Sequence, residues 1–293
     1  MFQQHSAYQA MPSKVSQLVL KQSADRCHAY FQAVKAYQED PSSFTGRPKP
    51  PGYADGRNLV KFNTQAIGKG EFSKGYIVPS MSPIKIPVKP GLNLEDICEV
   101  RLVPKVGCFV VEIVYDVYED ITNLQKPDSR LVAAIDIGLD NLATIVFSDG
   151  KVQPIIINGK PLKSENQFYN KQIAKLKSCW PPGVFTSIRI ENIIRNRNQF
   201  VETYLHQCSR IVVNKLLAVG VKEVAIGKNE QWKTGINLGK RTNQKFVQVP
   251  HARFIEMLTY KLEAVSIKVT VGEESYTSKA TFAGLGQYPN LHA

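Results

Sequence analysis

Two aspartates, Asp136 and Asp140, stand between two apolar runs and are the residues of this sequence best placed for metal chemistry. The runs are Leu131 to Ile135 and Leu142 to Phe147. A carboxylate at the end of a buried strand is costly to desolvate unless a cation or hydrogen-bond donors meet it, so Asp136 suggests a metal site. The spacing alone fits a second interpretation equally well, in which both aspartates only shape the turn.

Further strands and helices must hold this segment in place. The dipeptide Asp149-Gly150 is a hairpin signal, and it leads into a third short strand over residues 151–157. Periodicity then predicts two helices, a strand, a helix and a last strand, over residues 164–178, 186–218, 223–226, 250–265 and 265–271. This order of elements indicates an α/β domain.

The first part of the chain has a different pattern. Apolar residues recur at helical spacing over residues 11–39 and predict one amphipathic helix. Short β-type runs separated by glycine and proline follow over residues 58–118 and favour a small barrel or sandwich. The clearest hairpin pairs 98–104 with 108–118. These patterns predict three domains, with bounds 1–42, 43–128 and 129–293.

The charge of the chain favours a polyanionic partner. The 293 residues include 37 Lys and Arg against 25 Asp and Glu, a formal net charge of +12. Such an excess attracts nucleic acid through phosphate contacts and counterion release. The five cysteines form no CxxC pair, which argues for reduced thiols and against a disulfide framework or a zinc ribbon. No signal peptide or long apolar run is present, so we expect a cytoplasmic protein with no membrane partner.

The predicted helical hairpin carries most of this positive charge. Between Lys151 and Lys215 eleven residues are Lys or Arg and three are Glu, which favours a surface that faces nucleic acid. The candidate contacts are Lys171, Lys175, Lys177, Arg189, Arg195 and Arg197. Aromatic residues lie among these charges, and for most of them core packing is the preferred interpretation over base stacking: Phe168, Tyr169, Trp180, Phe185 and Tyr204.

Three segments carry a resemblance to a known family. IDIGLDNLATIVFSDG, residues 135–150, resembles the first RuvC motif of the TnpB (OrfB) proteins of insertion sequences, relatives of the type V CRISPR effectors. Residues 224–279 are similar to one TnpB subgroup, and residues 46–67 extend the likeness towards the N-terminus. The resemblance implies an RNase H-like (RuvC-type) nuclease that uses a guide RNA to find and cut DNA. It also implies that residues 1–42 belong to a recognition lobe and residues 43–128 to a wedge domain.

The same resemblance suggests which acids hold the metal. Family members use two Mg²⁺ ions held by converging carboxylates, and Asp136 matches the first of these acids. The usual second acid would stand at Gly227 or Lys228 and is absent. The subgroup implies that Glu273 or Glu274 replaces it, although a solvated strand end explains these glutamates as well.

The C-terminal sequence departs from the family. Relatives continue past SYTSK into a zinc-binding region and a third catalytic Asp, whereas residues 280–293 read ATFAGLGQYPNLHA, with neither zinc ligands nor that Asp. We therefore expect an incomplete RuvC-like domain and impaired cleavage, because groups that act as a unit fail together. Two alternatives stay open: a nuclease-dead, RNA-guided DNA-binding protein, and a decayed transposase fragment with exposed apolar surface and weak self-association.

Overall fold

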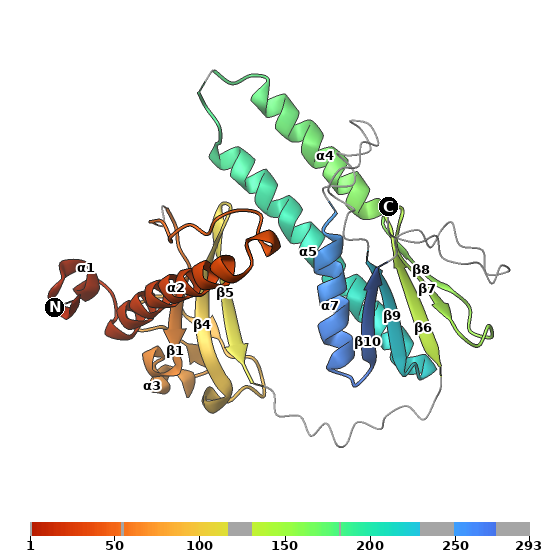
Figure 1. Cartoon of the computed structure of the whole chain (residues 1–293), viewed down its shortest axis with the longest axis horizontal. Coiled ribbons are helices and arrows are strands. Elements are labelled where there is room, and N and C mark those ends of the chain that lie inside the picture. Colours follow the sequence, from red (N-terminus) through yellow and green to blue (C-terminus); the bar gives the residue numbers. More distant parts are fainter. Residues whose placement is uncertain (1, 54–55, 117–130, 182, 229–248, 274–293) are drawn as a thin grey trace. The chain divides into compact units, whose positions relative to one another are not determined.

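The protein forms two compact units, Met1–Glu119 and Asp120–Ala293, in a computed structural model (Figure 1). The structure describes residues 2–53, 56–116, 131–181, 183–228 and 249–273. Each unit has its own cluster of buried apolar side chains. None of the helices in these described ranges is both long and apolar enough to cross a membrane.

The first unit combines one long helix with a small sheet. Strands β1, β4 and β5 form an antiparallel sheet in the order β1-β4-β5, and β2 and β3 form a separate pair. The bounds of the elements are η1 Phe2–Gln4, α1 Ser6–Gln9, α2 Ser13–Glu39, η2 Pro41–Ser43, β1 Val60–Asn63, η3 Thr64–Ala66, α3 Lys69–Phe72, β2 Tyr76–Ile77, β3 Ile86–Pro87, η4 Leu94–Asp96, β4 Ile97–Lys105 and β5 Cys108–Tyr115.

The predicted hairpin is confirmed, and the predicted barrel is not seen. Strands β4 and β5 pair from Lys105↔Cys108 onwards around a turn in which Gly107 has a φ of 72°. Among the described residues, the strands form an open sheet and a short pair instead of a closed barrel. Proline limits strand pairing here, because it cannot donate a hydrogen bond to a neighbouring strand. The region of β2 and β3 contains Pro79, Pro83 and Pro87.

The second unit is built on a five-stranded sheet in the order β10-β9-β6-β7-β8 (Figure 1). Neighbours β6, β7 and β8 are antiparallel, as the sequence predicts, whereas β9 is parallel to both β6 and β10. The bounds are β6 Val132–Ile137, β7 Asn141–Phe147, β8 Ile155–Asn158, α4 Lys160–Lys177, α5 Ile188–Val219, β9 Glu223–Lys228, α7 His251–Glu263 and β10 Lys268–Glu273. The predicted helices and strands are thus confirmed to within a few residues.

One face of this sheet is buried under helices. Along β6, Ala133, Ile135 and Ile137 are buried, and they share one core with the apolar stripes of α5 and α7. Gly220 ends α5 in the left-handed conformation with a φ of 78°, which glycine adopts readily at the C-terminal end of a helix. The helices therefore cover one face of β6, and its alternate residues point to the other face.

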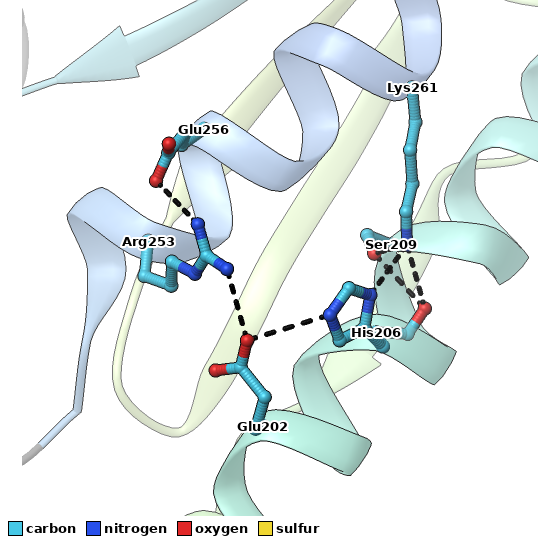
Figure 2. Close-up of polar contacts among 6 residues, drawn as sticks. All are labelled: Glu202, His206, Ser209, Arg253, Glu256 and Lys261. Atoms are coloured by element: carbon cyan, nitrogen blue, oxygen red, sulfur yellow. Dashed lines mark hydrogen bonds and ion pairs between the residues drawn. The ribbon is translucent and has the colours of Figure 1, made fainter. Parts of the chain in front are cut away.

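A chain of polar contacts joins α5 to α7 (Figure 2). Lys261 is buried, and its Nζ donates to Ser209 Oγ at 2.6 Å and to the His206 carbonyl at 3.1 Å. Nearby, Arg253 links Glu256 at 2.9 Å to Glu202 at 3.1 Å. These contacts hold α5 and α7 together, and both helices contribute many of the buried side chains of the core.

We expect replacement of Lys261 by methionine to change how stability depends on pH. Burial, with a smaller contribution from Arg210, lowers the pKa of Lys261 below its usual value. The folded protein therefore loses this proton at a lower pH than the unfolded chain does, and stability rises with pH between the two pKa values. In urea unfolding at a series of alkaline pH values, the wild type should gain stability relative to Lys261→Met.

The control for this prediction is Lys215→Met, which removes one positive charge from the exposed surface of α5. The wild type should show no comparable alkaline gain relative to this variant. If Lys261→Met and Lys215→Met follow the same curve, the buried ammonium does not influence stability as the contacts indicate.

Candidate functional site

Asp136 lies on the face of the sheet that α5 and α7 leave open. Asp136 lies on β6 and is exposed, whereas its neighbours Ile135 and Ile137 are buried. The expectation that this carboxylate must be desolvated is therefore wrong. The run from Leu131 to Ile135 looks continuously apolar in sequence, and the placement of Asp136 on the open face explains why its charge is tolerated.

Small residues surround Asp136 across three neighbouring strands. Thr144 of β7 is its partner in the register. Since β9 pairs with β6 up to Ile135↔Ile226, Gly227 comes next beside Asp136, and Gly227 in turn pairs with Gly272 of β10. These residues line a shallow hollow of about 320 Å³. Because glycines occupy the neighbouring positions on β9 and β10, the hollow leaves room for a ligand beside the carboxylate.

The two glutamates assigned by the family resemblance are only partly placed. Glu273 is the last residue of β10 and pairs in register with Lys228 at the end of β9. Its side chain and the whole of Glu274 lie outside the described residues. Within the described residues no three His, Cys, Asp or Glu side chains gather to hold a metal. The assignment of Glu273 and Glu274 therefore stays a prediction.

The second aspartate of the motif has a structural partner. Asp140 forms an ion pair with Lys163 of α4, and its carbonyl accepts a hydrogen bond of 2.8 Å from the Gly159 amide. On the other side, the buried His251 at the start of α7 places Nε2 3.1 Å from the Gly138 carbonyl oxygen. Contacts from α4 and α7 thus fix the turn that follows Asp136.

The predicted basic residues divide into two groups. Lys171, Lys175, Lys177 and Arg189 are exposed, whereas Arg195 and Arg197 are partly buried. Arg197 Nε donates to Asn166 Oδ1 at 2.8 Å, and its guanidinium lies 5.8 Å from the centre of the Tyr169 ring. Burial lowers the pKa of Arg197. Through its contacts with Asn166 and Tyr169, Arg197 joins α5 to α4, and the sequence pattern does not reveal this role.

Several aromatic side chains on this unit lie in solvent. Phe168 is 58% exposed and Phe185 is 85% exposed, so core packing is the wrong interpretation for both. Tyr204 does pack against the core, and its hydroxyl donates to the Asn158 carbonyl at 2.6 Å. Burial raises the pKa of Tyr204 to about 12, so the phenol keeps its proton at neutral pH. Phe200 was not among the residues predicted from the sequence, although it lies one helical turn before Tyr204.

Comparison with known proteins gives one family. Residues 112–233 match the family model OrfB_IS605, described as a probable transposase. No curated protein matches the sequence. Two solved structures are similar at low identity: a CRISPR-Cas12f ternary complex, with 15% identity and a TM-score of 0.41, and a Cas12f1-sgRNA-target DNA complex, with 12% identity and a TM-score of 0.40.

The aligned regions leave out much of these structures. The first match covers 62% of this chain and 36% of the other, and the second covers 83% of this chain and 62% of the other. TM-scores below 0.5 do not establish a shared fold. The family match stands on the sequence of residues 112–233, which includes Asp136 and the whole of β6, β7 and β8. Over this segment the protein is similar to the OrfB family of probable transposases.

Proposed function

We propose that this protein is a TnpB-like, RNA-guided DNA endonuclease that hydrolyses phosphodiesters with Mg²⁺. The observation that carries the proposal is Asp136, exposed on the central strand β6 between an antiparallel pair of strands and a parallel pair. The strand order β10-β9-β6-β7-β8 supports an RNase H-like fold. The family match of residues 112–233 agrees with this fold and with an origin in a mobile element.

The donor chemistry around Asp136 fits a magnesium ion. The ion prefers hard oxygen ligands and keeps several waters, and the open hollow beside Asp136 offers a carboxylate with space around it. Asp136 would hold the metal together with Glu273 or Glu274. When bound, such ions would activate water and stabilise the leaving oxygen of a phosphodiester. The chain itself orients the acid by fixing β6 between β7 and β9.

The partners that we propose are a guide RNA and a DNA target. The net charge of +12 and the exposed lysines of α4 support a polyanionic partner. Lys171 and Lys175 lie one turn apart on the same side of α4, and Lys177 is the last residue of this helix, so the three add positive charge to its C-terminal end, where a phosphate backbone can bind.

We expect removal of these lysines to weaken binding in a salt-dependent way. The triple variant Lys171→Ala, Lys175→Ala, Lys177→Ala should reduce the slope of log affinity against log salt by about 2 to 3, since each lost phosphate contact releases roughly one counterion fewer. Fluorescence anisotropy at several salt concentrations measures this slope. The triple Lys→Arg variant keeps the charge and should keep the slope; an unchanged slope for the alanine variant would remove α4 from the interface.

The experiment that tests the proposed function starts from co-purified RNA. The protein is expressed with its native flanking DNA, purified at high salt, and the bound RNA is sequenced. A discrete RNA with a constant scaffold and a variable end is expected, and the complex should cut DNA that matches the variable end. Only degraded bulk RNA, or a discrete RNA without matched cleavage, would contradict the endonuclease proposal.

A further inference from the structure

The exposed side of α5 carries a feature that phosphate binding does not explain. Two neighbouring hollows, of about 430 Å³ and 600 Å³, lie along this helix. The first is lined by Asn196, Gln199, Phe200, Thr203, Tyr204 and Gln207. Its lining consists of three amides, a hydroxyl and two aromatic rings, with no charged side chain among these residues. Neutral donors and acceptors around a ring are suited to a flat polar ligand.

The two rings form a fixed platform. The rings of Phe200 and Tyr204 are nearly parallel, at 10°, with their centroids 6.1 Å apart. Tyr204 is anchored at both ends, because its ring packs against the core and its hydroxyl donates to the Asn158 carbonyl of β8. Phe200 is 40% exposed, so one side of the stacked pair is open to a ligand.

The amide side chains share this face with the rings. Asn196, Gln199, Thr203 and Gln207 are exposed and recur three or four residues apart, which places them along one side of the helix. Each amide offers both a donor and an acceptor. Amides of this kind pair with the donor and acceptor edge of a nucleobase, and aromatic rings stack on its face.

We propose that this face of α5 binds an unpaired nucleobase of a single-stranded nucleic acid, stacked on Phe200 and contacted at its edge by Gln199 and Gln207. The proposal rests on the proposed function, which supplies the nucleic acid. It adds a contact with a base to a surface otherwise explained by phosphate contacts. Arg195 and Arg210 stand on the same helix before and after the platform, about 22 Å apart along its axis, and suit the phosphates of the same strand.

Other occupants fit this face less well. A helical protein partner needs apolar anchors repeated over two or more turns, whereas the linings of both hollows contain only Phe200 and Ile211 as large exposed apolar residues. A duplex keeps the faces of its bases stacked inside the helix, so it cannot use the platform. An unpaired strand offers the open base faces that Phe200 can contact.

The test compares two strands that differ only in their bases. Binding is measured without magnesium by anisotropy, with a labelled single-stranded oligonucleotide and an abasic strand of equal length and charge, each as RNA and as DNA. Phe200→Ala should weaken binding of the base-containing strand about five- to hundredfold and leave the abasic strand unchanged. The salt slope should not change, because no phosphate contact is lost. Gln199→Ala should act in the same direction.

Two controls keep the proposal falsifiable. Phe200→Trp retains a stacking surface and should bind both strands like the wild type. Leu217→Ala removes an apolar side chain that is 42% exposed near the end of the same helix, and it should not change binding of either strand. Thermal unfolding of every variant separates loss of binding from loss of fold. Equal weakening on both strands, or none on either, would overturn the proposal.

The outcome also separates this proposal from the proposed function. If the triple lysine variant loses affinity for both strands while Phe200→Ala loses none, the nucleobase site is wrong and the nucleic-acid surface stands. If the wild-type protein binds neither strand, both proposals fail. Association of two copies that Phe200→Ala abolishes, without any difference between the strands, would assign the platform to protein contact instead.

Discussion

Asp136→Asn is expected to lower the rate of magnesium-dependent DNA cleavage by at least about a thousandfold, because removal of one acid from a set that acts as a unit removes most of its catalysis. The substitution keeps the shape of the side chain and removes only its charge. Asp136 is exposed on the open face of β6, outside the core. The stability of the protein should therefore change by no more than about 0.5 kcal/mol, and RNA and target binding should persist.

The measurement is single-turnover cleavage of matched DNA by the purified complex. Asp149→Asn is the control: Asp149 is an exposed acid in the next turn, and its carboxylate accepts hydrogen bonds from the Lys151 and Val152 amides, which an asparagine oxygen also accepts. This variant should cleave at the wild-type rate. Titration calorimetry with Mg²⁺ gives a second readout, in which only Asp136→Asn should lose affinity.

Three results of this experiment lead to different conclusions. Wild-type cleavage by Asp136→Asn would remove Asp136 from the site. A wild-type complex that binds its target but does not cut would favour the nuclease-dead alternative. With an active wild type, separate Glu273→Gln and Glu274→Gln variants decide which glutamate is the second acid.

Much of the second unit was predictable from the sequence because its signals are local. Asp149-Gly150 marks the hairpin between β7 and β8, Gly220 ends α5, and apolar periodicity identifies both long helices. These features depend on neighbours in the chain, so they can be found without the tertiary structure. The order of the strands in the sheet depends on distant pairings, and only the family resemblance indicated it.

The exposure of Asp136 was not predictable, because it depends on which face of the sheet the distant helices cover. The segment before it contains alanines on both faces, Ala133 buried and Ala134 exposed, so the sequence shows no polar alternation to identify the open face. The pairing of Gly227 with Gly272 clears space beside the carboxylate, and it depends on the register of β9 and β10. The sequence shows that the family's usual second acid is absent at Gly227. It does not show that Gly227 and Gly272 leave a hollow beside Asp136.

Contacts between distant helices were also outside the reach of the sequence. Lys261 reads as a surface lysine in an amphipathic helix, yet it is buried against Ser209 and His206 of α5 (Figure 2). Arg197 reads as a nucleic-acid contact, yet it bonds to Asn166. Long side chains reach partners that no local pattern specifies, so charge counts predict a basic surface better than they predict its members.

Gly159→Ala is expected to destabilise the second unit by about 2 to 4 kcal/mol, which corresponds to a fall in Tm of roughly 5 to 15 °C for a unit of this size. Gly159 precedes α4, and a Cβ there would overlap the Leu139 carbonyl oxygen while it lies only 3.0 Å from the Leu139 carbonyl carbon and 3.1 Å from the Asp140 carbonyl oxygen. All three are backbone atoms, so no side-chain rotation relieves the clash. The backbone of Gly159 is in the ordinary helical region, at a φ of −96°, so the constraint is space.

The same substitution should reduce cleavage, because the displaced turn begins two residues after Asp136. Gly159 donates its amide to the Asp140 carbonyl at 2.8 Å, and Lys163 of α4 pairs with the Asp140 carboxylate, so a shift of the turn disturbs both contacts. Gly70→Ala in α3 is the control: a Cβ there meets nothing within 4 Å, and alanine favours the helix, so stability should stay equal or rise slightly. Calorimetry and the cleavage assay are performed on both variants. Wild-type Tm and activity for Gly159→Ala would show that the turn after β6 adapts, and that its close packing against α4 does not position Asp136.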